Sequence, residues 1–508
     1  MKRKNTDWIL LIGVLIYLFI ITIPLAGALA QQTGKIDGSI GLRQISLLGN
    51  SLKLGITVTM IDLLLGFFCA IYISNSKKLT GWKKYYFVAM MPIPFYIYAL
   101  SWMYMLKLLA FVCPEIIRYS VSGIGACIFV ETLAYFPVAT LFLLIGIDNI
   151  DADRVRMASV YGSDNKVVWQ VIVQSIIPYA SAAAGLICTL SMTEFSVPSM
   201  FQYNTYALDI FSVYSRTGSA LTAYIQCVPL ILSLVIPIIW LVRNINQFGI
   251  KANKKEKYLL KTTGVIGAMG KIAFSVSLLQ IFVPIIVFLI TAGGVQNVYF
   301  GWKMVADELN TSFWTSFFCA AICILLSSIP SMFLKRHLTG VPGVILYTMA
   351  IPGAIQAMGL LKVINMVGLI SFEKSIWMTS LGCALKMAPF VILWLCVARM
   401  RVDTHTIEMA EIYAINKFEP IKVRIHIFMP AYIAGFGIAF FLAFAEESIP
   451  LILMAPGKET ITVKIYNYLH YGASDYVSAF SIVVILFIFC IEITMILIYK
   501  VLKGMKVR

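Results

Sequence analysis

Long apolar blocks follow one another along almost the whole chain, and this constrains its fold more than any other feature. Each holds roughly 18 to 25 residues, enough for a helix to cross the hydrocarbon core of a bilayer. Only helices and closed barrels satisfy their backbone polar groups in lipid. Because 60% of the 508 residues are hydrophobic and 13% are charged, a soluble globular fold is excluded. We expect an all-α polytopic membrane protein with about 12 transmembrane helices. The expected spans begin near Trp8, Leu52, Tyr85, Ser120, Trp169, Leu221, Ile272, Phe313, Val344, Ile376, Pro430 and Tyr476.

A short pattern occurs twice in the chain. Residues 194–198 and 446–450 share Glu, Ser and Pro at matching places, 252 positions apart (446 minus 194). The same offset relates Pro178 to Pro430. We therefore expect two tandem six-helix repeats. Duplicated membrane halves usually enclose a path at their interface, so the repeat points to transport.

Three segments divide the expected architecture. Residues 1–243 form the first six-span domain, residues 244–271 a polar, Lys-rich linker, and residues 272–508 the second six-span domain. No other non-apolar stretch reaches the ~50 residues of an independent soluble domain. The chain also lacks a phosphate-cradling GxxxxGK[ST] loop. We expect a chain that is not itself an enzyme, with any energy-converting domain on a separate chain.

Basic residues are distributed unevenly between the two sides of the expected membrane. If Met1 is cytoplasmic, the inside segments hold 28 of the 40 Lys and Arg residues and the outside segments hold 11. The positive-inside rule then places both termini in the cytoplasm, and it explains the net charge of +16 without a nucleic-acid partner. A cleaved signal peptide is the alternative for the N-terminal segment, since Ala28-Leu29-Ala30 resembles a cleavage site. The apolar run before it exceeds the usual ~7 to 15 residues, which favours a retained first helix.

In each half, an amphipathic segment that is not apolar enough to span follows the fourth span. The two segments are Asp151–Lys166 and Asp403–Lys422. Ala158 and Gly162 are four residues apart, as are Ala410 and Ala414, so each pair would leave a shallow patch on one helix face. We expect a partner to approach there. The alternative is a short interfacial helix that only closes a loop.

These segments resemble the coupling loops of the inner-membrane permease subunits of ATP-binding-cassette importers. In that family the pattern Glu-Ala-Ala, three residues, then Gly forms a helix that docks on the ATPase subunit. Here the pattern falls on Arg156-Met157-Ala158 with Gly162 and on Glu408-Met409-Ala410 with Ala414. The first copy lacks the Glu and the second lacks the Gly. The resemblance implies the ATPase-coupling residues Arg156, Ala158, Gly162, Glu408, Ala410 and Ala414.

Within this family the chain is most similar to the two-domain permeases for ferric iron, and thiamine and phosphonate permeases are similar in the same places. The fused halves, the segment 193–198 and the segment 455–472 carry the resemblance. It implies a multi-pass protein of the bacterial cell membrane that imports a small solute, ferric iron first among the candidates. It also implies two ATPase subunits at the cytoplasmic face and an extracytoplasmic solute-binding protein. The chain itself would hold no cofactor, because ATP is bound by the partner.

Several ionisable residues fall inside expected spans, where burial of a charge is costly and usually reflects a partner or a wet cavity. They are Asp62, Glu131, Glu194, Lys386, Glu446 and Glu447. Glu194 and Glu446 each precede a Ser-x-Pro that should interrupt the helix, and interrupted helices at equivalent places are candidate permeation sites. Alternatively, these carboxylates cap the backbone or pair with Lys386, holding the halves together. The translocation-path or gate candidates are Glu194, Ser196, Pro198, Glu446, Ser448, Pro450 and Lys386; the four scattered histidines predict no metal site.

Two other classes of function stay open. An ion-coupled secondary transporter also uses about 12 helices and internal repeats, but it would need a relay of intramembrane carboxylates and no paired docking helices. A membrane enzyme or an assembly scaffold would need a nucleophile, a metal constellation or a sizeable soluble domain, and the sequence offers none of these.

Overall fold

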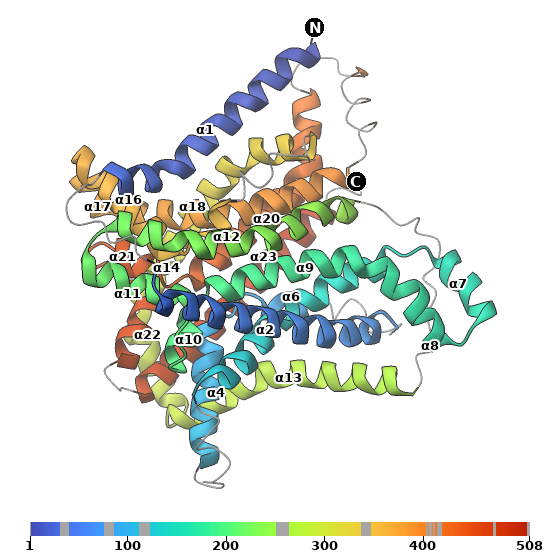
Figure 1. The fold of residues 1–508 in the computed structure, drawn as a ribbon, viewed down its shortest axis with the longest axis horizontal. Helices are drawn as coiled ribbons and strands as arrows, with labels where there is room; N and C mark the ends of the chain where they lie inside the picture. Colours follow the sequence, from blue (N-terminus) through green and yellow to red (C-terminus); the bar gives the residue numbers. More distant parts are fainter. Residues whose placement is uncertain are drawn as a thin grey trace.

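The computed structural model describes residues 2–30, 40–75, 86–110, 122–249, 264–336, 347–402, 405, 409, 412–413, 419–470 and 474–504. Every regular element in these ranges is helical (Figure 1). The long helices are α1 (Lys2–Ala30), α2 (Leu42–Ser74), α6 (Ile124–Asp148), α9 (Val173–Thr193), α12 (Ala220–Asn244), α13 (Val265–Thr291), α14 (Val295–Arg336), α18 (Ile376–Met400), α20 (Glu419–Ala445) and α23 (Ser474–Gly504). Among the described residues, these 10 helices are long and apolar enough to cross a membrane, α9 together with the π-helical turn that precedes it. The prediction of an all-α polytopic membrane protein is confirmed.

Two expected spans correspond to shorter apolar helices. They are α4 (Phe95–Ala110), where a span was expected near Tyr85, and α16 (Gly353–Val367), where one was expected near Val344. The remaining helical elements are shorter still. They are α7 (Ala152–Tyr161), α8 (Asp164–Val167), α10 (Ser196–Met200), α11 (Tyr206–Thr217), α17 (Ile370–Glu373), α21 (Pro450–Leu453) and α22 (Ile461–His470), with one-turn η1 (Val168–Ile172), η2 (Ile245–Gly249) and η3 (Tyr347–Ala350).

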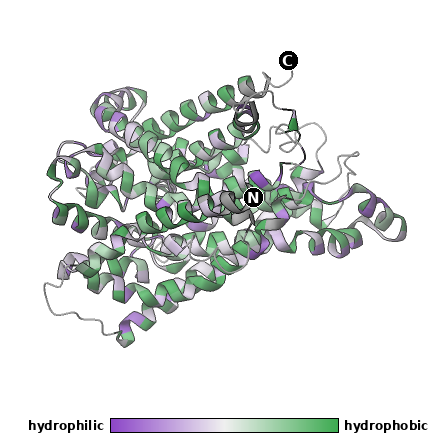
Figure 2. Ribbon diagram, turned by 90° about the horizontal axis from the view of Figure 1, so that it is seen from above, coloured by the Kyte–Doolittle hydropathy of each residue, from purple (hydrophilic) through white to green (hydrophobic). Residues whose placement is uncertain are grey.

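Apolar residues predominate along the bundle on its outside as well as its inside (Figure 2). Phe19, Phe282 and Leu325 are large apolar side chains that lie exposed on long helices. A helix that is apolar all round is stable at a surface only where that surface contacts lipid. The exposed apolar side chains are therefore those that a bilayer would cover.

The helices pair in the same pattern in both halves of the chain. In the first half α2 packs against α6 and α9, and in the second half α14 packs against α18 and α20. The first helix of each half, however, lies on the other half: α1 packs against α14 and α16, while α13 packs against α2 and α4. The two halves are thus joined by an exchange of their first helices.

Glycine allows the close approach of α1 to α16. A Cβ atom at Gly359 would lie 2.0 Å from the carbonyl oxygen of Pro24, and one at Gly27 would lie 2.2 Å from the carbonyl oxygen of Gly359. No side chain fits at either position, so the two backbones are in direct contact, as small residues allow in membrane helix pairs.

The expected linker is partly helical. Helix α12 runs to Asn244 and is followed by η2, and α13 begins at Val265, inside the segment 244–271 that was expected to connect the halves. Residues 250–263 lie outside the described part of the chain. Residues 265–271 therefore extend a membrane helix rather than a loop.

Candidate functional site

Both halves break a helix at the repeated Glu-x-Ser-x-Pro. Helix α9 ends at Thr193, Glu194 is extended (φ −74°, ψ 137°), and α10 then begins at Ser196. Helix α20 ends at Ala445, and α21 begins at Pro450. A proline cannot donate to the carbonyl four residues before it, and its ring clashes with that carbonyl. Those carbonyls belong to Glu194 and Glu446, so the prolines place both breaks at the glutamates.

The glutamate side chains bond back to the serines of the repeat. Glu194 Oε1 accepts from the backbone N–H of Ser196 at 2.8 Å and from the Ser196 hydroxyl. Glu446 Oε1 accepts from the Ser448 hydroxyl. Each carboxylate therefore stabilises the turn that follows its own helix, which is the capping role expected as an alternative to a gate.

The second-half glutamate also forms an ion pair. Lys386 Nζ, on α18, lies 2.7 Å from Glu446 Oε2. Gly353, at the start of α16, leaves room for this pair, since a Cβ there would lie 3.0 Å from Lys386 Nζ and 2.6 Å from Ser448 Oγ. The expected pairing is present, but both partners belong to the second half, so the pair ties α18 to the helix break and does not join the halves.

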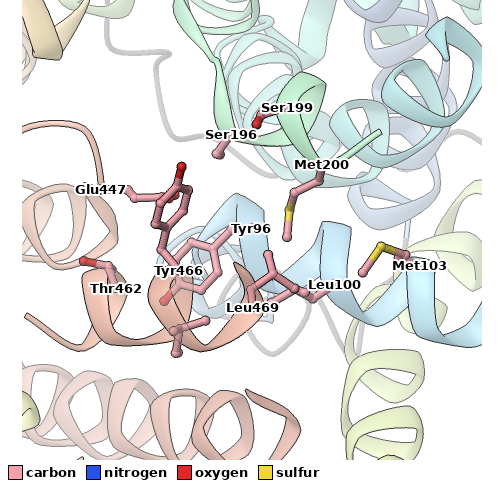
Figure 3. Close-up of a pocket in the computed structure, with 11 residues that line it drawn as sticks. Tyr96, Leu100, Met103, Ser196, Ser199, Met200, Glu447, Thr462, Tyr466 and Leu469 are labelled. Atoms are coloured by element: carbon pink, nitrogen blue, oxygen red, sulfur yellow. The ribbon is translucent and has the colours of Figure 1, made fainter. Parts of the chain in front are cut away.

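A cavity of about 210 Å³ lies between the two halves (Figure 3). The first half lines it from α4 and α10, and the second half from α22 and the break after α20. Its lining residues are Tyr96, Leu100, Met103, Ser196, Ser199, Met200, Glu447, Thr462, Ile465, Tyr466 and Leu469. Every polar side chain among them ends in an oxygen atom, and Glu447 provides the carboxylate.

The cavity and the predicted gate residues overlap only in part. Of those residues, Ser196 lines the cavity. The cavity residue Glu447 interacts electrostatically with both Glu194 and Glu446. Pro198 and Pro450 are buried and act on the backbone. The tyrosines at 96 and 466 were not predicted, because their positions depend on how α4 and α22 pack and not on a local pattern.

The first expected coupling segment is a short helix at one end of the bundle (Figure 1). Asp151 caps α7, accepting from the backbone N–H of Asp153 at 3.1 Å. Val155 is buried, and Ala158 packs beside it against the ends of the long helices. Gly162 follows the end of α7 with an extended backbone (φ −155°), so it does not continue the helix face that carries Ala158.

Helix α7 exposes large apolar side chains beside its charged ones. Met157, Val160 and Tyr161 are exposed, Val160 to 78%. Arg156 is also exposed and lies 3.7 Å from Asp153. The sequence analysis emphasised small residues, of which Ala158 packs against the bundle, and missed these larger ones.

The second expected coupling segment is described at a few positions only. Met409, Ile412 and Tyr413 are exposed, Ile412 to 72%. Each stands 252 positions after its first-half counterpart (409 − 157, 412 − 160, 413 − 161). Glu408, Ala410 and Ala414 lie outside the described residues. An exposed apolar triplet therefore occurs at equivalent positions in both halves.

The described ranges hold no group of three or more His, Cys, Asp or Glu side chains that could bind a metal ion. Fold and cavity together define a membrane-embedded helical protein with a small cavity between the two halves of its chain. No family model matches the sequence, and no curated protein matches it significantly.

Proposed function

We propose that this chain is the permease subunit of an ATP-driven importer and moves a small solute into the cytoplasm by alternating access. In this proposal its 12 spans form two six-helix repeats, with both termini in the cytoplasm of a bacterial cell. Helices α4 and α16 supply the third span of each repeat, and the recurrent packing of α2 and α14 supports that arrangement. Two ATPase subunits and an external solute-binding protein complete the importer.

The matched apolar triplets carry the proposal. Met157, Val160 and Tyr161 project from α7, and the equivalent residues of the second half are exposed in the same way. Large apolar side chains on an otherwise polar segment outside the bundle favour a protein partner over lipid. Two equivalent surfaces favour two copies of one partner, as a pair of ATPase subunits would provide.

The cavity supports a path between the halves. Closure of the ATPase subunits on ATP would push the two coupling segments together and rock the halves about their interface, opening the cavity to alternate sides. Its volume of about 210 Å³ is below the ~300–1,000 Å³ typical of drug-sized ligand pockets, which favours a small solute.

The lining favours a cation among small solutes. Oxygen donors and one carboxylate suit a hard cation, in agreement with the ferric iron that the resemblance implies. Thiamine, phosphonate and other small solutes are the alternatives, and the external binding protein would select among them.

Charged substitutions at the apolar triplets test the proposal. The variant Val160→Asp with Ile412→Asp should insert into membranes normally, because both side chains lie outside the bundle. It should lose co-purifying ATP hydrolysis, since a charge disrupts an apolar interface. Ser163→Asp, an exposed change in the same loop, is the matched control. Wild-type ATP hydrolysis in the double variant would refute the proposal.

An ion-coupled secondary transporter is the second candidate, favoured by a series of carboxyl groups inside the bundle. Asp62, Glu131 and Glu194 are electrostatic neighbours in turn, and Glu194 is a neighbour of Glu447. Uptake by energised vesicles that lack any ATPase would establish this alternative, and uptake that requires the ATPase would exclude it.

A further inference from the structure

Two acidic side chains are buried together in the first half, away from the cavity. Asp62 is on α2 and is 0% exposed, and Glu131 is on α6 and is 1% exposed. Helices α2 and α6 pack closely together, and the two carboxyl groups interact electrostatically. Neither has an ion-pair partner among the described residues.

Few of the carboxyl oxygens of this pair accept a hydrogen bond within the described part of the chain. The Ser191 hydroxyl of α9 donates to Glu131 Oε2. Within the described part of the chain, both carboxyl oxygens of Asp62 and Oε1 of Glu131 have no hydrogen-bond partner. An ionised carboxylate in that condition would lose its hydration without compensation, which costs far more than protonation.

A buried tyrosine gives independent evidence that the site is built to hold a ligand. The Tyr135 hydroxyl also has no hydrogen-bond partner among the described residues. Tyr135 interacts electrostatically with Glu194, Glu131 and Asp62. Its ring packs against Phe95, with the ring centroids 4.7 Å apart. A tyrosine hydroxyl also accepts hydrogen bonds, so this unpaired hydroxyl can serve as the acceptor for the proton of a neutral carboxyl group.

We propose that Asp62 and Glu131 form a proton-binding site inside the membrane. Each carboxyl group is neutral in this conformation, and the proton is the ligand. The other titratable groups around the pair are Tyr135 and Cys127 on α6 and Glu194 after α9. Glu194 is also the electrostatic neighbour of Glu447 at the cavity, so it lies between the pair and the cavity.

Infrared spectroscopy of the purified chain tests this directly. A protonated carboxyl group gives a C=O stretch that an ionised one lacks, and exposed acids are ionised at neutral pH. The band should be present at neutral pH and lose a component in Asp62→Asn and another in Glu131→Gln. These amides match the neutral acids in size, so folding should be preserved. Asp307→Asn, at an exposed position on α14, is the matched control and should leave the band unchanged.

A change next to the pair provides a check that keeps both acids. Ser191→Ala removes the donor to Glu131, and the Glu131 component should move to higher frequency, because hydrogen bonding weakens the C=O bond. Absence of the band from the unaltered protein would overturn the proposal. A band that is unchanged in the Asp62→Asn, Glu131→Gln double variant, or carboxylate bands that shift on addition of Na⁺ or K⁺, would also overturn it.

Discussion

The two repeated glutamates have different neighbours, although their backbones break in the same way. Glu446 pairs with Lys386 on α18. The position equivalent to Lys386 in the first half is Ala134 (386 − 252), so Glu194 has no corresponding ammonium group. The charge of Glu446 is therefore balanced by an ion pair, whereas Glu194 accepts hydrogen bonds from Ser196.

Removal of the Lys386 ammonium group should reveal how much its ion pair with Glu446 contributes to the stability of the fold. Lys386→Ala leaves Glu446 buried without its ion-pair partner, and we expect the free energy of unfolding to fall by roughly 3 kcal/mol. Arg43→Ala breaks an ion pair with Asp209 of similar length, 2.9 Å, whose arginine is 69% exposed. That control should cost less than about 1 kcal/mol. Thermal unfolding in detergent measures both, and equal losses would contradict a structural role for the Lys386 pair.

At the scale of elements, each half fastens its short helix to its second span. The Ser51 hydroxyl on α2 accepts from the backbone N–H of Tyr206 on α11 at 2.9 Å, and the Ser312 hydroxyl on α14 accepts from that of Ile461 on α22 at 2.8 Å. An ion pair between the same two helices accompanies each hydrogen bond. It is Arg43 with Asp209 in the first half and Lys464 with Glu308, at 2.6 Å, in the second. Helix α22, which lines the cavity, and its counterpart α11 are thus each held to a long helix.

The exchange of first helices gives a prediction at the same scale. Gly13 of α1 lies beside Ile329 of α14, because a Cβ at Gly13 would lie 3.1 Å from the Ile329 Cβ. Gly13→Cys with Ile329→Cys should form a disulfide under oxidation. Mass spectrometry of the cross-linked peptides would detect it. Gly13→Cys with Gly49→Cys should not cross-link, since a Cβ at Gly49 meets nothing within 4 Å. Equal cross-linking of the two pairs would show that α1 does not lie on the second half.

The helices and their breaks were predictable because their causes are local. An apolar run of about 20 residues has few alternatives to a membrane helix, and Pro198 and Pro450 act on carbonyls four residues earlier. The exchange of α1 and α13 was not predictable, because it depends on contacts such as Gly359 with Pro24, far apart in sequence. The partnership of Asp62 with Glu131 has the same origin, since both were identified as intramembrane acids but lie on different helices.

For the whole molecule, the cavity lies between the halves and α7 lies outside the bundle at one end (Figure 1). A path at the interface of two halves needs a driving force that moves one half against the other. The long helices that end near α7 continue through the bundle toward the cavity, so in the proposed cycle a push on the expected coupling segments would act on the halves as nearly rigid units.

In the proposed transport cycle, ATP bound by a partner opens and closes the space between the halves. Spin labels at Ser199→Cys on α10 and Leu469→Cys on α22 would stand on opposite sides of the cavity. Their dipolar coupling, measured in the complex with the co-purifying ATPase, should change when ATP is trapped by vanadate and return to its starting value after nucleotide release. A coupling that is unaffected by ATP, and that changes instead with a transmembrane proton gradient, would contradict the ATP-driven account.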